Sequence, residues 1–351
     1  MEHKNKEILW VDWIRVLATF GVVLLHAAAP LLSMYNKIPD VYWWTGNIYD
    51  SMVRMCVPLF FMLSGSLLLQ KPYSLKTFFL KRVNRILTPL LAWSVFFVLW
   101  KAYVEHSATL ASFSLSSLLY EPAYFHLWFL YTLIGLYLFI PVLSVLVRHA
   151  DKLVLQYFVV LWFLAASLIP MAKKFTEFTI GIDLRFISGY TGFLILGWLL
   201  GKQHLTKNNA MAAGIMAFIG VLITAFGTYF LMLNNNGIYL GYFYGPLAPN
   251  VILLAISVFV LIRYAAENFS IASHPIILPI VRSLSSASLG IYLVHTCFLY
   301  LLRHGHLGIY LYGHRWNPLF SVPAVAVTAF CLSYGTIYIL RKNHLTRKLV
   351  P

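Results

Sequence analysis

Apolar segments long enough to cross a lipid bilayer constrain this chain more than any other feature. A spanning helix needs about 20 mostly apolar residues. Of the 351 residues, 60% are hydrophobic and 11% are charged, whereas soluble domains carry roughly 25% charged residues. We therefore predict an all-α polytopic integral membrane protein with about ten transmembrane helices, and we exclude a soluble enzyme and a nucleic-acid-binding protein. The predicted spans lie near residues 10–32, 47–69, 86–104, 126–147, 153–171, 187–201, 210–233, 246–264, 284–302 and 318–340.

The distribution of basic residues predicts the orientation of these spans. The chain has 26 Lys and Arg against 11 Asp and Glu. With the amino terminus inside, 17 of the basic residues fall in inner segments and 7 in outer ones. Because cytoplasmic loops are enriched in Lys and Arg, both termini are predicted to be cytoplasmic. The first span is too long and too charged for a cleavable signal. The three cysteines lie in apolar runs and predict neither a disulfide nor a metal site.

The first predicted helix contains two ionisable residues that share a face. Arg15 and His26 are eleven residues apart, which is about three helical turns and a rise of about 16 Å. Ionisable groups inside a membrane usually face the protein interior and are functional. Asp12, one turn before Arg15, is placed to pair with it. The alternative is that Arg15 reaches the inner headgroups and His26 makes a helix–helix hydrogen bond.

The second predicted helix and the loop after it contain two further polar features. Pro58 leaves a backbone carbonyl without its helical partner, and Gly65 permits a close approach, so a bend or cavity is expected here. In the loop, Arg82 and Arg85 lie one turn apart before the third span. Two guanidinium groups suit phosphate binding, although the enrichment of basic residues in inner loops also explains them.

The outer ends of several spans are rich in aromatic residues. His126, Trp128 and Tyr131 lie at the outer mouth of the fourth span. Tyr, Trp and Asn also fill the outer segments 35–49 and 234–246. Such rings and amides suit a sugar or a lipid headgroup, but an interfacial aromatic belt has the same composition.

The ninth and sixth spans each carry a spaced motif. In the ninth, Ser288, Tyr292 and His295 lie on one helical face, and the alternative to a functional role is an interhelical hydrogen-bond seam. In the sixth, Gly197 and Gly201 form a G-x-x-x-G pattern that favours helix packing over dimerisation.

Together these motifs resemble the membrane-bound acyltransferase family three. The resemblance rests on the Arg-x10-His of the first helix and on the segments VPLFFMLSG, FLKRVNRILTPLL, HLWFLYTLIGLY and GIYLVH, and it covers residues 10 to about 340. It implies an enzyme that moves an acyl group, usually acetyl, from cytoplasmic acyl-CoA to a hydroxyl of an extracytoplasmic or lipid-linked glycan. It further implies a single transmembrane acyltransferase domain over residues 1–351, in a stand-alone form, in the bacterial inner membrane.

The resemblance implies roles for the candidate residues. Acetyl-CoA or another acyl-CoA is the expected donor, with no metal. His26 would take the proton from the acceptor hydroxyl or carry the acyl group itself. Tyr292, Tyr131 or a backbone amide would stabilise the oxyanion, and His295 is a further catalytic candidate. The expected CoA-binding residues are Arg15, Arg82 and Arg85, and the expected acceptor-binding residues are His126, Trp128 and Tyr131.

Two other classes of protein fit some of the same features. A secondary transporter or glycan exporter would also have many helices, a broken helix and intramembrane Arg and His. Against it, the two halves show no hydropathy repeat. A proton-coupled carrier is also expected to carry an intramembrane carboxylate, and Asp12 lies too near the inner interface. A structural assembly subunit would not explain why Arg15 and His26 share one face of the first helix.

Overall fold

The computed structural model describes most of the chain and divides it into two compact units. The described residues are 2–109, 114–176, 181, 184, 187, 189–269 and 274–350, without the side chains of residues 2–8, 81, 83, 115 and 119. Unit 1 comprises residues 1–67 and 150–334, and unit 2 comprises residues 68–149 and 335–351. Arg185, which the sequence analysis counted with the outer loops, lies outside the described residues.

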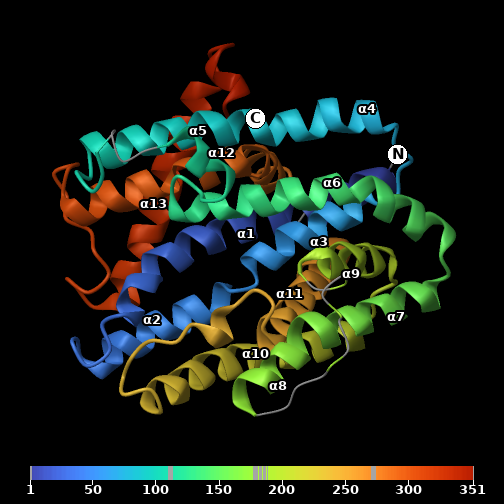
Figure 1. Cartoon of the computed structure of the whole chain (residues 1–351), viewed down its shortest axis with the longest axis horizontal. Helices are drawn as coiled ribbons and strands as arrows, with labels where there is room; N and C mark the ends of the chain where they lie inside the picture. Colours follow the sequence, from blue (N-terminus) through green and yellow to red (C-terminus); the bar gives the residue numbers. More distant parts are fainter. Residues whose placement is uncertain are drawn as a thin grey trace. The chain divides into compact units, whose positions relative to one another are not determined.

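Helices account for nearly all the regular structure of the described residues (Figure 1). Unit 1 contains α1 (Glu2–Leu32), α2 (Asp40–Val53), α3 (Cys56–Leu68), α7 (Lys152–Phe163), α8 (Ile169–Phe175), α9 (Thr191–Lys202), α10 (Lys207–Leu233), α11 (Pro249–Asn268), α12 (Ile277–His304) and most of α13 (Pro318–Leu340). Unit 2 contains α4 (Leu75–Phe78), α5 (Asn84–Tyr103), α6 (Trp128–His149) and the end of α13. Short π-helical or 3-10 segments are η1 (Phe79–Val83), η3 (Leu115–Leu119), η4 (Phe125–Leu127), η5 (Leu164–Leu168), η7 (Tyr242–Tyr244) and η9 (Thr346–Lys348).

The prediction of a polytopic all-α membrane protein is confirmed. Within the described part of the chain, nine helical segments are long and apolar enough to cross a membrane. They match nine of the ten predicted spans in order. The sixth predicted span, 187–201, corresponds to α9, which has only 12 residues. At about 1.5 Å per residue it is roughly 18 Å long, well short of the roughly 30 Å hydrocarbon core.

Helix α1 is at the centre of unit 1, because it packs against α2, α11 and α12. Helices α10 and α11 lie side by side (Figure 1). Glycines allow α3 and α9 to touch: a Cβ atom added to Gly65 would lie 1.9 Å from the Leu194 carbonyl oxygen, and one added to Gly197 would lie 2.0 Å from the Met62 carbonyl oxygen. The G-x-x-x-G pattern therefore serves helix packing within the chain, as predicted.

The second span is interrupted at Arg54 and Met55, between α2 and α3. Pro58 explains the position of the break, because proline has no N–H to donate to the carbonyl four residues earlier, which is that of Arg54. Leu59, the next residue with an N–H, donates to the Met55 carbonyl at 3.0 Å. The bend expected from Pro58 is therefore present as a break.

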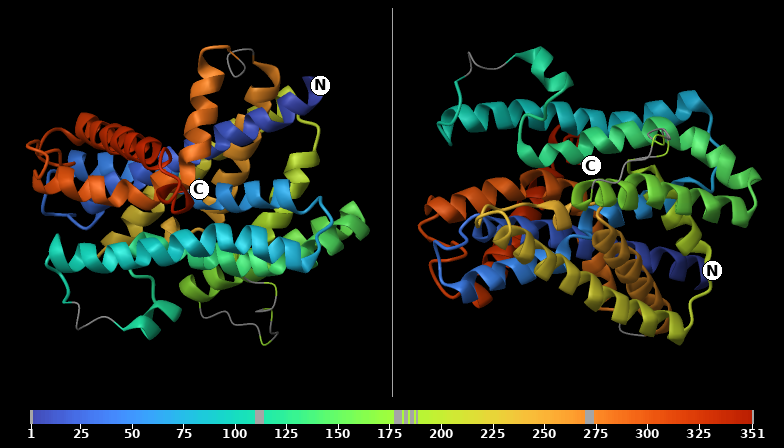
Figure 2. Two further views of the ribbon diagram at one scale, coloured as in Figure 1. Left: turned by 90° about the horizontal axis from the view of Figure 1, so that it is seen from above. Right: turned by 60° about the horizontal axis from the view of Figure 1, so that its bottom comes forward.

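In unit 2, α5 and α6 run side by side in both ribbon views (Figures 1 and 2). The segment that holds Arg82 and Arg85 was predicted as a loop, and this was wrong. It is helical, with α4 continuing through the π-helical segment η1 into α5. Proline at position 89 falls inside α5 without ending it. Neighbouring helices can compensate the hydrogen bond that such a proline removes.

Candidate functional site

A polar network joins α1 to α12 near Arg15. The Arg15 guanidinium donates from Nη1 to Ser285 Oγ at 2.8 Å, and Ser285 Oγ donates to Asp12 Oδ1 at 2.5 Å. Arg15 Nη1 and Asp12 Oδ1 are 3.6 Å apart, so the predicted pairing of these residues is present. The Arg15 side chain keeps 32% of its surface exposed. The network therefore fixes one edge of the guanidinium and leaves part of it accessible to a ligand.

Eleven residues further along α1, His26 contacts the same neighbouring helix. His26 Nδ1 and His295 Nε2 are 2.8 Å apart. The two rings are nearly parallel, with an interplanar angle of 7° and centroids 5.1 Å apart. Because both Arg15 and His26 contact α12, the predicted common face is confirmed. The same contacts show that α1 and α12 run parallel.

The second nitrogen of His295 fixes the protonation pattern of the pair. His295 Nδ1 lies 2.7 Å from the Tyr292 carbonyl oxygen. A carbonyl oxygen only accepts, so His295 Nδ1 carries the proton, and Nε2 of the neutral ring is an acceptor. His26 Nδ1 then donates to it, and the lone pair of His26 is on Nε2. This assignment, made from the hydrogen-bond network, gives His26 the tautomer of a general base or nucleophile.

The three predicted residues on the buried face of α12, Ser288, Tyr292 and His295, differ in their contacts. His295 is fully buried and Tyr292 is 4% exposed. Ser288 donates to the Leu284 carbonyl of its own helix at 3.2 Å. His295 therefore fixes the orientation of the His26 ring, and Tyr292 contributes its backbone carbonyl to that arrangement. The contact between His26 and His295 would also fit a purely structural interhelical hydrogen bond. The second hydrogen bond, from His295 to the Tyr292 carbonyl, sets the tautomers of both rings and favours a general base.

A second polar cluster lies on α2 and was not predicted from the sequence. Asp50 is completely buried and forms an ion pair with Arg54. The Arg54 guanidinium lies 4.0 Å from the ring centroid of Tyr244, whose hydroxyl donates to Asn47 Oδ1. The available signal was a carboxylate and a guanidinium four residues apart in an apolar run. Both residues lie inside the predicted second span, 47–69, but only Pro58 and Gly65 were considered there.

The two loop arginines belong to unit 2. Arg82 lies in η1 and is partly buried, and Arg85 lies in the first turn of α5 and is exposed. They are one turn apart, as predicted. Arg15 belongs to unit 1. Joint binding of one CoA by the three arginines stays a prediction.

The three residues predicted at the outer mouth of the fourth span also belong to unit 2. His126 is 1% exposed and lies edge-on to the rings of Phe97 and Tyr124. Trp128 is half-buried at the start of α6. The Tyr131 hydroxyl donates its proton to a backbone carbonyl, that of residue 118, at 2.7 Å, which leaves it no proton for an oxyanion. Acceptor binding by these residues stays a prediction.

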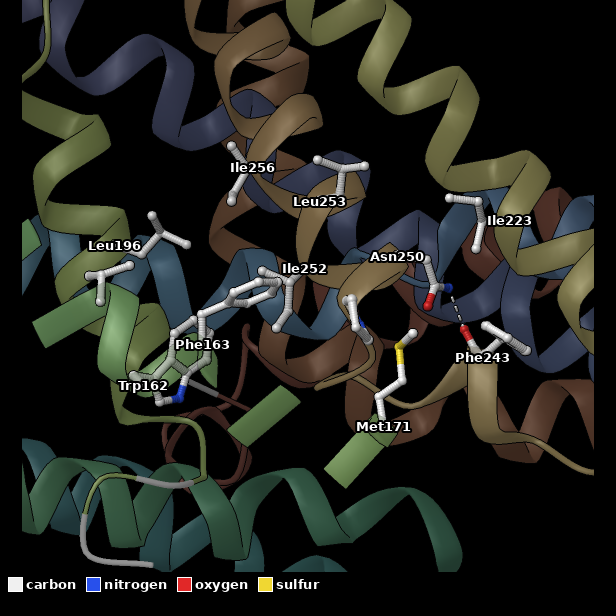
Figure 3. Close-up of a pocket in the computed structure, with 12 residues that line it drawn as sticks. Trp162, Phe163, Met171, Leu196, Ile223, Phe243, Asn250, Ile252, Leu253 and Ile256 are labelled. Carbon is white, nitrogen blue, oxygen red and sulfur yellow. Dashed lines mark hydrogen bonds between the residues drawn. The ribbon is translucent and has the colours of Figure 1, made fainter. Parts of the chain in front are cut away.

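Unit 1 also contains an apolar cavity of about 380 Å³ (Figure 3). Its walls come from α7, α8, α9, α10, η7 and α11. Asn250 is its polar residue, and its Nδ2 donates to the Phe243 carbonyl and to Thr224 Oγ1, both at 2.7 Å. The residues that line this cavity include no ionisable group. The polar groups suited to acyl transfer lie instead along α1, α2 and α12.

Comparisons with known proteins identify the family. A family model described as an acyltransferase domain, acyltransferase family 3, matches residues 8–338. Searches of curated proteins and of solved structures gave no significant match. The match contains the whole Arg-x10-His motif, the cluster on α2 and the buried stripe on α12. The chain therefore belongs to acyltransferase family three and is a multi-pass membrane acyltransferase.

Proposed function

We propose that the protein is an acyl-CoA-dependent O-acyltransferase of the bacterial cytoplasmic membrane. It moves an acyl group, in the simplest case acetyl, from cytoplasmic acyl-CoA to a hydroxyl of an extracytoplasmic or lipid-linked glycan. The hydrogen-bonded series from the Tyr292 carbonyl through His295 to His26 carries this proposal. It gives an intramembrane histidine an oriented lone pair.

Arg15 is suited to bind the donor. Its guanidinium is fixed by Asp12 and Ser285 while about a third of the side chain stays exposed. Guanidinium groups bind phosphates through paired, charge-assisted hydrogen bonds. Along α1, Arg15 and His26 are separated by about 16 Å, which an extended pantetheine arm can bridge. Arg82 and Arg85 would add cations to the nucleotide end of the same donor.

The proposed reaction requires one proton acceptor and one acyl acceptor. His26 Nε2 takes the proton of the acceptor hydroxyl as that oxygen forms a bond with the thioester carbonyl carbon. The tetrahedral intermediate collapses with cleavage of the C–S bond, and the CoA thiolate receives the proton from His26. The products are an acyl ester and free CoA. Direct transfer and transfer through an acyl-His26 intermediate give the same products from the same reactants.

One feature of the structure supports the transporter alternative. A proton-coupled carrier was not expected from the sequence because no carboxylate was predicted inside the membrane, and this was wrong. Asp50 is a buried carboxylate within a spanning segment. It forms an ion pair with Arg54, one turn further along the same segment. Family membership and the His26–His295 geometry together favour the enzyme.

Calorimetry of the detergent-solubilised protein with CoA tests the proposal. We expect binding at low salt that weakens as salt rises, because exposed phosphate contacts are screened over roughly 10 Å at 0.1 M. Arg82→Ala and Arg85→Ala should each weaken CoA binding by about 1.5–3 kcal/mol, the range for a charge-assisted hydrogen bond. Lys207→Ala, at the start of α10 and outside the predicted donor site, is the control. Absence of CoA binding at low salt, together with glycan flux into proteoliposomes, would establish the transporter instead.

A further inference from the structure

The ion pair of Asp50 and Arg54 leaves two buried polar atoms unsatisfied. Asp50 Oδ2 pairs with Arg54 Nη2, but Asp50 Oδ1 and Arg54 Nε have no hydrogen-bond partner among the described residues. Asp50 has no exposed surface, and the Arg54 side chain is 16% exposed. Buried charged groups are nearly always fully hydrogen-bonded, and each exception calls for an explanation. The two atoms comprise one acceptor and one donor.

The surrounding residues hold this pair in place. The Tyr244 ring lies against the Arg54 guanidinium, and the Tyr244 hydroxyl donates to Asn47 Oδ1. Asn47 in turn donates from Nδ2 to the carbonyl of residue 225 in α10 at 3.0 Å. Burial raises the pKa of the nearby Tyr239 hydroxyl to about 12, so this residue of the outer loop stays a hydrogen-bond donor at neutral pH. The site is therefore built before any ligand arrives.

Helix packing places the pair at the level of His26. A Cβ atom on Gly21 of α1 would lie 3.5 Å from Val53 Cβ of α2, and one on Gly46 of α2 would lie 2.6 Å from Leu31 Cβ of α1. The two helices are therefore antiparallel. Midway between these contacts, His26 of α1 is level with the residues near Asp50 on α2.

Arg54 follows Asp50 by one helical turn, on the same face of the segment that packs on α1. The proposed base and the unsatisfied pair therefore occupy one region of unit 1.

A hydroxyl group carries both the donor and the acceptor that these two atoms lack. It donates its proton to Asp50 Oδ1 and accepts from the Arg54 Nε–H. The Asp50–Arg54 pair has no net charge, so it matches a neutral polyol better than an anion or a cation. A saccharide carries neighbouring hydroxyls, so one can be held by the pair while another faces His26.

On the basis of the proposed acyl transfer, we propose that Asp50 and Arg54 form the acceptor site and bind a hydroxyl of a neutral saccharide next to the one that is acylated. The donor would then approach along α1 from Arg15, and the acceptor from the side of α2. His26 lies between the two approaches. Packing of α2 alone does not require a buried ion pair, and acceptor binding would give this pair a function.

Steady-state kinetics with an envelope glycan fraction, quantified by hexose content, test this site. Asp50→Asn turns one carboxylate oxygen into an amide donor, and Arg54→Lys removes the Nε–H. Each variant should raise the KM for the glycan by about ten- to a hundredfold, as expected for loss of a charge-assisted hydrogen bond. The KM for acetyl-CoA should stay within about twofold of wild type. Asp40→Asn, an exposed carboxylate at the start of the same helix, is the matched control.

A double variant protects the test against misfolding. Removal of one partner leaves a buried unpaired charge, which is strongly destabilising, whereas removal of both avoids that penalty. The Asp50→Asn/Arg54→Gln protein should bind acetyl-CoA normally and still show the raised glycan KM. An unchanged glycan KM in the double variant and in Asp50→Asn would overturn the acceptor site while leaving the acyltransferase proposal intact. Failure of the wild-type protein to use acetyl-CoA at all would overturn both.

Discussion

Replacement of His295 separates positioning from packing at the proposed catalytic centre. His295 Nε2 accepts a hydrogen bond from His26 Nδ1 at 2.8 Å, and its Nδ1 is tied to the Tyr292 carbonyl at 2.7 Å. In His295→Leu the His26 Nδ1–H loses its acceptor, and the ring is free to adopt the tautomer with its proton on Nε2. His26 can then no longer accept the proton of an acceptor hydroxyl.

The expected size of this effect follows from the hydrogen bond that is lost. A buried donor left without a partner costs about 1–3 kcal/mol. At about 1.36 kcal/mol for each factor of ten, kcat should fall roughly 5- to 150-fold in His295→Leu. A glutamine side chain places its amide oxygen near the position of the imidazole Nε2, so it can accept from His26. His295→Gln should therefore retain much more activity than His295→Leu.

The assay is the initial rate of acyl transfer from labelled acetyl-CoA, with the KM for acetyl-CoA as a measure of intact folding. Thr296→Val is the matched control, because Thr296 is the next residue on α12, is buried and has an unsatisfied hydroxyl. This control should keep wild-type kcat. Equal losses in His295→Gln and His295→Leu, or full turnover in His295→Leu, would refute the tautomer argument.

Three further predictions concern the base, the packing and the topology. His26→Gln should lower kcat by about 10²–10⁴, the usual contribution of general-base catalysis, and near-normal turnover would return His26 to a packing role. Gly197→Ala should lower the melting temperature, because its Cβ would lie 2.0 Å from a carbonyl oxygen of α3, whereas Gly214→Ala meets nothing within 4 Å and should not. In a background without native cysteines, Ser74→Cys should be labelled only from the cytoplasm and Asn235→Cys only from outside. The outside position of Asn235 requires the short α9 to cross the membrane as a tenth span. Labelling of both from the cytoplasm would mean nine crossings and would contradict the predicted orientation.

The spans and the shared face of Arg15 and His26 could be predicted from the sequence, because both depend on local helical geometry. Residues eleven positions apart lie on the same face of any α-helix. Long apolar runs identify the segments that can cross a bilayer. The prediction of a loop around Arg82 failed because basic residues were taken to interrupt the helix, whereas η1 continues it with a π-helical turn.

The partner of His26 could not be predicted, because His295 is 269 residues away in sequence. Each helix shows its polar face in the sequence, but neither pattern says which other helix it contacts, and only the packing of α1 against α12 brings the two rings together. The Asp50–Arg54 pair was within reach, since two charges four residues apart form a visible intramembrane pattern. Their missing hydrogen bonds, by contrast, are a property of the folded protein.

The balance between acyl ester formed and CoA released tests the proposed function most directly. Purified protein, labelled acetyl-CoA and an envelope glycan fraction should give one labelled ester on the glycan for each CoA thiol released, and alkaline hydrolysis should remove the label. The ester should be absent with His26→Ala and present with His304→Ala, an exposed histidine on α12. Release of CoA without labelled glycan, or no consumption of acetyl-CoA by the wild-type protein, would contradict acyl transfer to a glycan hydroxyl.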